Sequence, residues 1–408
     1  MDLARDLGGE AAGLRLHNSL SNAQEPILGI PGPDGSRLVR LYVCGVTPYD
    51  TGHMGHAFTF CSYDVLVRWL EASGLGVRYV QNVTDVDDPL FERARRDGVP
   101  WQELAERETG HLIRDMTLLG WRAPDHMPRV SEEIEPILEA LQQLWERGCA
   151  YQTDRVYFPV AAYPSYGALS QLSRRSMIRK LKAEGLLGEV GAGGKRDALD
   201  FPLWRPSQEG EPSWPSSFGP GRPGWHIECS VMAMRYLGDQ IEIHGGGRDL
   251  RFSHHESERA QSEVLTGRSP FAGCWTHVGM VRYQGHKMSK SLGNLVVVEE
   301  AAARVPAAAI RLYLAMHHYR RDWSFEWAGL ERAALLCSDL ARLIGDEVAP
   351  ETALSAPPGA RVAQFRDALN RDLDTARAVA ILRRTVVERD AAAAGWMTSI
   401  LCGRAALR

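Results

Sequence analysis

Two apolar runs, each followed by a polar turn, stand out in the first quarter of the chain. Residues 37–45 (RLVRLYVCG) and 76–86 (GVRYVQNVTDV) are predicted to form buried strands. Between them, residues 57–74 carry apolar side chains at helical spacing and end in Gly74, a residue that commonly ends a helix. The order strand, loop, helix, strand predicts a parallel α/β sheet with ligands bound at its strand ends.

The later pattern is mostly helical, with one irregular stretch. Helices are expected at 88–98, 100–121, 131–148, 225–238 and 253–267, a strand at 239–247, and helices again from about residue 295 to Arg408. Ser131 is placed to cap the third of these helices. Residues 150–224 contain runs rich in Gly, Pro and Ser and are predicted to be a mobile or loop-rich insertion.

Composition indicates an ordinary soluble globular protein. The chain has 408 residues, of which 44% are hydrophobic and 24% charged. Its formal net charge of -4 gives no indication of a nucleic-acid partner. Seven scattered cysteines do not suggest a secreted disulfide framework. The first residues lack the apolar core of a signal peptide, and no run is apolar enough to span a bilayer. We therefore expect a cytoplasmic protein with no membrane partner, and nothing demands an oligomer.

The turn YVCGVTPYDTGHMGHA (residues 42–57) raises the first chemical question, because Cys44 lies just before His53 and His56. The thiol could be a metal ligand, a nucleophile with a histidine base, or a small core residue. The HMGH motif lies between a strand end and a helix start, where helix amides favour anions, and Gly55 permits close approach of a ligand. Alone, the motif fits two histidines on a surface turn about as well as a phosphate site.

A second motif, HKMSKSLGN at residues 286–294, changes this balance. Lys287 and Lys290 flank a short turn, and their ammonium groups could neutralise a triphosphate and its pyrophosphate leaving group. Two lysines in a loop are usually just solvated. An early HxGH turn paired with a late KMSKS loop on an α/β chain is, however, a specific combination.

This pair of motifs resembles the nucleotide-binding signatures of the class I aminoacyl-tRNA synthetases. The stretches YVCG, GRPGWHIECS, HGGGRDL and HHESE are similar to the cysteinyl branch, and the resemblance runs from about residue 38 to residue 376. It implies a Rossmann-type catalytic domain at 1–320, with an inserted connective segment at about 115–222, and a C-terminal helical domain at 321–408. It also implies that cysteine and ATP with Mg²⁺ form cysteinyl-adenylate, with His53, His56, Lys287 and Lys290 stabilising the transition state.

The resemblance also implies a metal site. Cys44, Cys229, His254 and Glu258 come from distant segments, although His254 and Glu258 are one helical turn apart. From the residues alone, two small buried cysteines and a capping histidine would be the favoured interpretation. In the family, one zinc ion holds the sulfur of the substrate cysteine, a soft ligand that serine lacks.

Further residues are expected around the amino acid and the nucleotide. Asn82, Val83 and Thr84 follow the second strand, and Thr84 and Thr47 could orient the substrate. Asp249 could bind ribose or an ammonium group, or simply cap a helix, and Trp225, which lies in the family's amino-acid site, could be a core residue. The expected pocket residues are Cys44, Gly45, Val46, Thr47, Gly55, Thr59, Asn82, Val83, Thr84, Trp225, Gly247, Arg248, Asp249 and Val281.

Two kinds of enzyme share this core: cysteinyl-tRNA synthetases, and the ligases that join cysteine to the amine of glucosaminyl-inositol in mycothiol biosynthesis. The stretches CGVTPYD and VQNVTDVDDPLFERA are closer to the ligase, and so is the short chain after residue 376. Two features do not match the ligase: the presence of Glu258, and the lack of an ERGGDP-like stretch in the insertion. We expect a cysteine ligase with a small-molecule amine acceptor, foremost glucosaminyl-inositol. The alternatives are tRNA, another amine, or a non-catalytic synthetase-like binding protein.

Overall fold

The central sheet is built around one long strand. The computed structural model describes residues 13–50, 52–191, 193–288, 293–345 and 356–403, with 405 and 407. In these residues, five strands form the main sheet: β3 (Ile30–Pro31), β4 (Arg37–Val46), β5 (Gly76–Val83), β10 (Ile241–Gly247) and β11 (Ala272–Val278). β4 pairs in parallel with β5 on one side and β10 on the other, β11 extends the sheet in parallel, and only β3 is antiparallel. The prediction of a parallel α/β sheet is confirmed.

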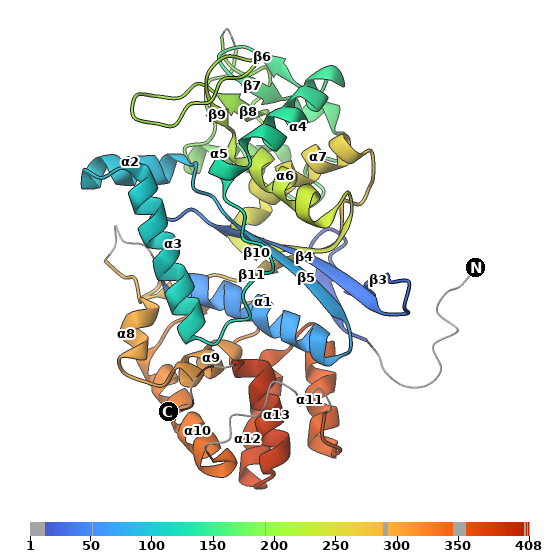
Figure 1. Cartoon of the computed structure of the whole chain (residues 1–408), viewed down its shortest axis with the longest axis vertical. Coiled ribbons are helices and arrows are strands. Elements are labelled where there is room, and N and C mark those ends of the chain that lie inside the picture. Colours follow the sequence, from blue (N-terminus) through green and yellow to red (C-terminus); the bar gives the residue numbers. More distant parts are fainter. Residues whose placement is uncertain are drawn as a thin grey trace.

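The alternation of side chains along β4 assigns its residues to two cores. Val39, Leu41 and Val43 pack in the core below the sheet, with α1 (Met54–Ala72). Tyr42 and Cys44 point the other way, into the core that contains α6 (Trp225–Leu237) and α7 (His254–Thr266). Figure 1 shows α1 on one side of the sheet and α6 and α7 on the other. The thiol of Cys44 therefore faces the helices that carry the other predicted metal ligands.

Helix α1 begins and ends at the expected signals. His53 is its N-cap, and the chain leaves the helix through Ser73 and Gly74, where Gly74 has a φ of 84°. The predicted cap at Ser131 is wrong. Ser131 lies in a short 3-10 turn, Val130–Glu132, and its hydroxyl donates to Asp85, while α4 (Ile134–Glu146) begins after Glu133 without a side-chain cap.

The insertion is more regular than its composition suggests. In the described part, β6 (Tyr151–Gln152), β7 (Val156–Phe158), β8 (Phe201–Arg205) and β9 (Arg222–Pro223) form an antiparallel four-stranded sheet. It lies with α4 and α5 (Arg174–Ala183) above the main sheet (Figure 1). These elements are short, and most of residues 150–224 lies outside them, so the expectation of a loop-rich segment is confirmed, with a small sheet and α5 that it did not include. Helices α2 (Asp88–Asp97) and α3 (Trp101–Leu118) connect β5 to this region.

Within its described residues, the C-terminal part is mostly helical, as expected. It comprises α8 (Val298–Ala302), α9 (Ala307–Ala315), α10 (Trp327–Ile344), α11 (Ala360–Asn370), α12 (Thr375–Val387) and α13 (Ala391–Cys402). These helices lie below the sheet in Figure 1 and share one hydrophobic core with α1. The division into domains at residue 320 stays a prediction. The remaining strands are β1 (Arg15–Asn18), β2 (Ala23–Pro26), β12 (Val281–Tyr283), β13 (His286–Lys287) and β14 (Trp323–Ser324).

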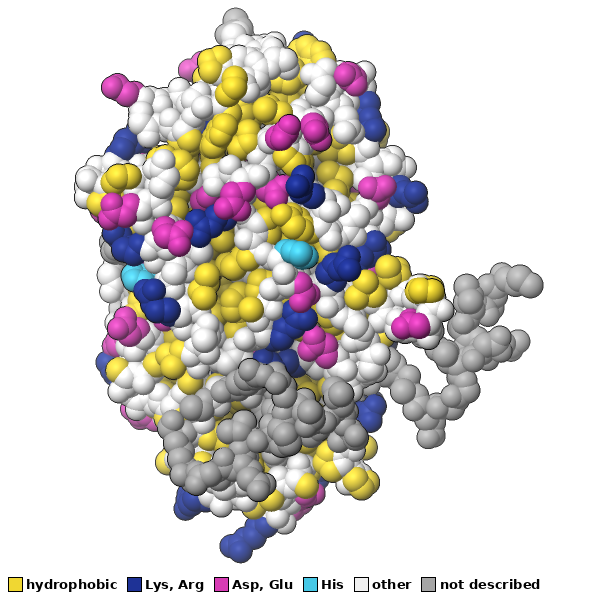
Figure 2. Space-filling model, in the orientation of Figure 1, with side chains coloured by type: hydrophobic (Ala, Val, Ile, Leu, Met, Phe, Trp, Pro, Cys, Tyr) yellow, Lys and Arg dark blue, Asp and Glu magenta, His cyan; other side chains and the backbone are white. Residues whose placement is uncertain are grey.

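The surface carries both signs of charge. On the face drawn in Figure 2, Lys and Arg are interspersed with Asp and Glu rather than gathered into one basic stripe. In the described part of the chain, no helix combines the length and apolar character needed to cross a membrane.

A buried ion pair fastens the C-terminal helices to α1. Arg311 and Asp64 are both inaccessible to solvent and bond to each other, while Arg68 and the Arg122 amide also donate to Asp64, at 3.0 and 2.6 Å. Arg311→Met would leave the Asp64 carboxylate buried without its main counter-charge. We expect the free energy of unfolding, measured by urea denaturation, to fall by about 3–5 kcal/mol.

The matched control is Arg342→Gln, because Arg342 pairs with Asp339 on the exposed surface. Exposed pairs contribute little to stability, so the urea midpoint of this variant should stay close to that of the unaltered protein. An equal fall in the free energy of unfolding in both variants would show that the Arg311–Asp64 pair does not contribute more because it is buried.

Candidate active site and metal centre

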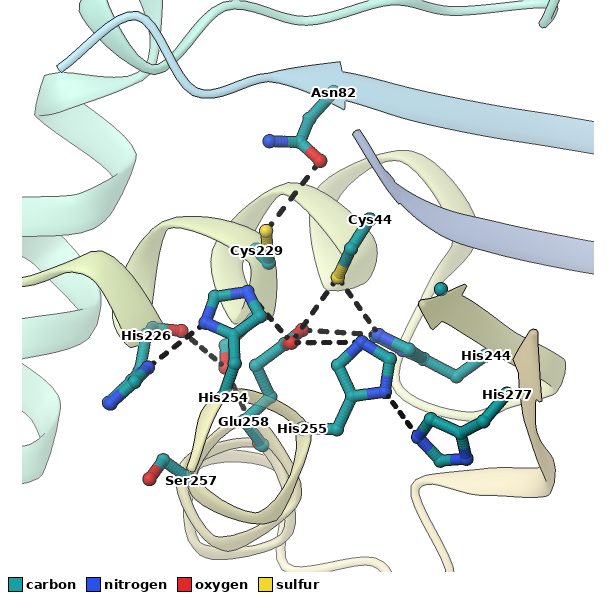
Figure 3. A network of polar contacts seen from close by, with 12 residues as sticks. Cys44, Asn82, His226, Cys229, His244, His254, His255, Ser257, Glu258 and His277 are labelled. Atoms are coloured by element: carbon teal, nitrogen blue, oxygen red, sulfur yellow. Dashed lines mark hydrogen bonds and ion pairs between the residues drawn. The ribbon is translucent and has the colours of Figure 1, made fainter. Parts of the chain in front are cut away.

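The four predicted metal ligands meet in the core above the sheet. Cys44 comes from the end of β4, Cys229 from the second turn of α6, and His254 and Glu258 from the start of α7. Their ligand atoms all lie within 4.8 Å of one another, and all four side chains are buried (Figure 3). Because α7 brings residues i and i+4 to one face, His254 Nε2 lies 3.1 Å from Glu258 Oε1.

The carboxylate of Glu258 lies at the middle of the cluster. The Cys44 thiol donates to Oε1 at 3.4 Å, and His244 Nε2 lies 3.2 Å from Oε2. Burial raises the pKa of Glu258 to about 7, and burial also raises the pKa of the Cys44 thiol, to which the nearby Cys229 and Glu258 contribute. Anionic forms of these groups would be costly here unless a cation accompanied them. This donor set therefore suits a cation.

The sequence prediction missed a second set of donors. His244 on β10 and His255 on α7, together with Cys44 and Glu258, also have ligand atoms within 4.8 Å of one another. His255 Nδ1 lies 2.9 Å from His277 Nε2 on β11, and the other ring nitrogen of His277 lies 2.8 Å from Ser19 Oγ. Finding His244 required knowing that β10 pairs beside β4, which the spacing along the chain does not reveal.

Trp225 and His226 fix the orientation of His254. The Trp225 ring stacks on the His254 ring, with centroids 4.1 Å apart and planes 19° apart. His226 Nδ1 lies 3.0 Å from His254 Nδ1, so the Nε2 atom is the one that faces the cluster. Such contacts on the outer nitrogen of a histidine are typical of metal sites. Trp225 thus contacts a candidate ligand, and its part in the amino-acid site stays a prediction.

Asn82 links Cys229 to Gly45, the residue that follows Cys44. Its Oδ1 accepts from the Gly45 amide at 2.9 Å and from the Cys229 thiol at 3.6 Å, and its Nδ2 donates to Thr84 Oγ1 at 2.9 Å. A Cβ at Gly45 would lie 1.6 Å from the Asn82 carbonyl oxygen, so this position requires glycine. The contact holds the end of β4 against the end of β5.

Four other predicted pocket residues lie in strands or directly after one. Val46 and Val83 are buried and pair across β4 and β5, and Val281 is buried in β12. Thr47, farther along the same loop, donates to Asp87 at 3.0 Å. The part played by each in binding stays a prediction.

The turn that follows the glycines at the end of β10 is held by a C-terminal segment and by α5. Arg248 donates to Asp322 at 2.8 Å and to the Arg320 carbonyl oxygen. The Asp249 carbonyl oxygen accepts from Lys180 at 3.2 Å, and a Cβ on Gly247 would lie 2.6 Å from the Asp249 carboxylate. This turn is therefore well anchored, and its contacts with a nucleotide stay a prediction.

The HxGH turn forms the beginning of α1. His53 Nδ1 accepts from the amides of Gly55 and His56, at 3.0 and 3.4 Å, and the two imidazole rings stack with centroids 3.8 Å apart. Because Nδ1 is an acceptor, a neutral His53 carries its proton on Nε2. Thr59 donates to the Gly55 carbonyl oxygen at 3.1 Å, which is a bond within the helix.

The second nucleotide motif cannot be placed in the same way. Lys290 and the side chain of Lys287 lie outside the described residues. Their predicted role therefore rests on the sequence motif.

Comparisons with known proteins show the family of the chain. The family model for the class I (C) tRNA synthetase catalytic domain matches residues 33–334. Over 351 residues, the chain is 48% identical to an L-cysteine:1D-myo-inositol 2-amino-2-deoxy-alpha-D-glucopyranoside ligase of Frankia alni, a match that covers 85% of this chain and 83% of the relative. The chain belongs to this class I synthetase-like ligase family. A ligase of the same description from Streptomyces avermitilis is 46% identical over 382 residues, 93% of this chain and 90% of the relative.

Solved structures of the wider class show the same fold. Methionyl-tRNA synthetase of Mycobacterium tuberculosis, in complex with methionyl-adenylate, superposes with a TM-score of 0.64 at 16% identity, over 89% of this chain and 88% of that chain. The LeuRS of Agrobacterium radiobacter, in a ternary complex with tRNA, gives a TM-score of 0.66 at 12% identity, over 92% and 85%. The expected class I synthetase fold is confirmed.

Proposed function

We propose that this protein is an ATP-dependent ligase that activates L-cysteine as cysteinyl-adenylate and transfers cysteine to the amine of glucosaminyl-inositol. The observation that carries the proposal is the gathering of Cys44, Cys229, His254 and Glu258 within 4.8 Å in a chain 48% identical to a ligase of that description. Transfer to another small amine, or to tRNA, is the alternative.

The donor set fits zinc. Two thiolates, one imidazole and one carboxylate are ligands that zinc accepts, and their burial excludes competing water. Cys44, Cys229 and His254 would hold the ion, with Glu258 as a fourth donor or as an acceptor for its neighbours. When bound, zinc would supply a soft Lewis acid for the sulfur of cysteine, which a serine hydroxyl does not match.

The protein's own groups would act mainly by positioning and by charge. In the first step, a carboxylate oxygen of cysteine attacks the α-phosphorus of ATP, and pyrophosphate leaves. In the second, the acceptor nitrogen attacks the carbonyl carbon, AMP leaves and the nitrogen loses a proton. The Nε2–H of His53, next to the first amides of α1, is suited to donate to a phosphate oxygen, and the two lysines of the KMSKS motif would neutralise the leaving pyrophosphate.

Charge favours a small acceptor over tRNA. The net charge is -4, and basic and acidic side chains mix on the face in Figure 2, whereas RNA-binding surfaces usually gather basic residues. A cytoplasmic location, a monomeric state and Mg²⁺ as the companion of ATP belong to the same proposal.

The first half-reaction can be tested by ATP–pyrophosphate exchange with cysteine or serine as the amino acid. Serine cannot make an equivalent of the metal contact to sulfur. The kcat/KM of ATP–pyrophosphate exchange should therefore be at least about 1,000-fold higher with cysteine than with serine. Equal exchange with serine would contradict the metal-based selection. Absence of cysteine-dependent exchange would contradict the proposed function itself.

A further inference from the structure

Helix α6 carries a second chemical group on the face that reaches the active site. Trp225, Glu228 and Cys229 are at positions i, i+3 and i+4 and therefore share one face of the helix. Trp225 stacks on His254, and Cys229 belongs to the metal-capable cluster, so this face looks toward the site. Glu228 lies between them in the sequence and is completely inaccessible to solvent.

The carboxylate of Glu228 has no hydrogen-bond partner. Among the described residues, neither its Oε1 nor its Oε2 meets a donor. Buried carboxylates in folded proteins are almost always bonded to donors or to a cation, because the group loses its hydration on burial. An unpartnered group of this kind beside a substrate site indicates that the partner is a ligand.

Other acidic groups surround Glu228. The negative charges of Asp87, Cys229 and Asp85 lie close enough to act on Glu228. Asp87 is half-buried at the N-terminus of α2, where its Oδ1 accepts from the Asp88 amide and its Oδ2 from the Thr47 hydroxyl at 3.0 Å. Because Thr47 directly follows β4, whose end carries Cys44, Asp87 borders the active site.

The nearby arginines are already engaged. Arg205 forms a bidentate pair with Asp88, at 2.7 and 2.9 Å. Arg222 bonds to Asp88 and donates to Glu211 at 2.8 Å. The hydrogen bonds of both guanidinium groups thus go to Asp88 and Glu211, not to Glu228 or Asp87.

We propose that Glu228 and Asp87 form a subsite that binds the primary ammonium group of a substrate. An ammonium group has three donors, and two carboxylates with the Thr47 hydroxyl offer it oxygen acceptors. The proposal rests on the proposed function, in which two substrates carry such a group: cysteine, at its α-carbon, and the acceptor amine.

The test uses the full-length protein with the isosteric variants Glu228→Gln and Asp87→Asn. Asparagine retains the capping oxygen at the start of α2, so that Asp87→Asn removes mainly the charge. If the subsite holds the α-ammonium of cysteine, the KM for cysteine in ATP–pyrophosphate exchange should rise about 10- to 100-fold in each variant, because a charge-assisted hydrogen bond is lost. Inhibition by 3-mercaptopropionate, which has the thiol but no amine, should be unchanged.

If the subsite instead holds the acceptor amine, exchange without acceptor should be unchanged and the KM for glucosaminyl-inositol should rise by a similar factor. Asp200→Asn is the control for general effects of removing a buried charge, because Asp200 lies just before β8 and its carboxylate accepts from Tyr151 and the Val160 amide. It should lower thermal stability without changing either KM, whereas Glu228→Gln should not lower it, because Glu228 has no internal partner to lose.

Unchanged KM values for both substrates in Glu228→Gln and Asp87→Asn would overturn the inference. So would a fall in the melting temperature of Glu228→Gln with no KM change specific to an amine, because that result would make the carboxylate structural. Failure of exchange in the unaltered protein would instead count against the proposed function, so the two failures are distinguishable.

Discussion

Cys44→Ala is expected to abolish metal binding and cysteine activation together. Within the described part of the chain, Cys44 belongs to both overlapping donor sets, the one with Cys229 and His254 and the one with His244 and His255. Removal of this thiol therefore leaves neither set complete. We expect the affinity for zinc and the rate of cysteine-dependent ATP–pyrophosphate exchange each to fall by at least about 100-fold, since the loss of even an outer contact at a metal site costs 10- to 100-fold.

Metal content by mass spectrometry and the exchange assay should be measured on the same preparation. Cys149→Ala is the matched control, because Cys149 is a partly exposed free cysteine whose thiol donates to the Arg147 carbonyl oxygen outside the cluster. It should retain both zinc and activity. A Cys44→Ala protein that kept one tightly bound zinc and full exchange would refute the assignment of the cluster as the metal centre.

His53→Asn should separate the two roles of His53. Asparagine is a good N-cap and can still accept from the amides of Gly55 and His56, so the start of α1 should remain intact. The donor at Nε2 is lost, and with it the proposed contact to a phosphate oxygen. We expect kcat for exchange to fall about 100-fold, the usual effect of removing one transition-state donor, with little change in melting temperature.

His53→Ala is the companion variant, because it removes both the cap and the donor. Its kcat should fall as in His53→Asn, and its free energy of unfolding should in addition fall by about 1 kcal/mol. If His53→Asn instead retained full activity while His53→Ala lost it, His53 would be a capping residue only, and the phosphate contact would have to come from elsewhere.

Local patterns predicted the parts of the site that depend on one segment. The spacing of apolar residues identified β4, α1 and β5, and glycine marked the end of α1 at Gly74. Helical periodicity also placed His254 and Glu258 on one face, which their 3.1 Å contact confirms. The gathering of Cys44 and Cys229 came from the family resemblance, because no local rule links residues 185 positions apart.

The parts that were missed depend on tertiary neighbours. His244 enters the site only because β10 pairs with β4, and His277 follows because β11 pairs with β10. The Ser131 hydroxyl donates to Asp85, a residue distant in the chain. This bond takes the place of the helix cap that the position of Ser131 suggested. The strands of the insertion are too short to show a clear alternation of apolar and polar residues. Their sheet could therefore not be foreseen from the sequence.

The central claim is tested most directly by identifying what the activated cysteine is transferred to. The purified protein should be incubated with ATP, Mg²⁺ and cysteine, together with glucosaminyl-inositol and tRNA in the same reaction, and the products identified by mass spectrometry. We expect cysteinyl-glucosaminyl-inositol and AMP, with the tRNA left uncharged. Charging of tRNA with no product on glucosaminyl-inositol would contradict it.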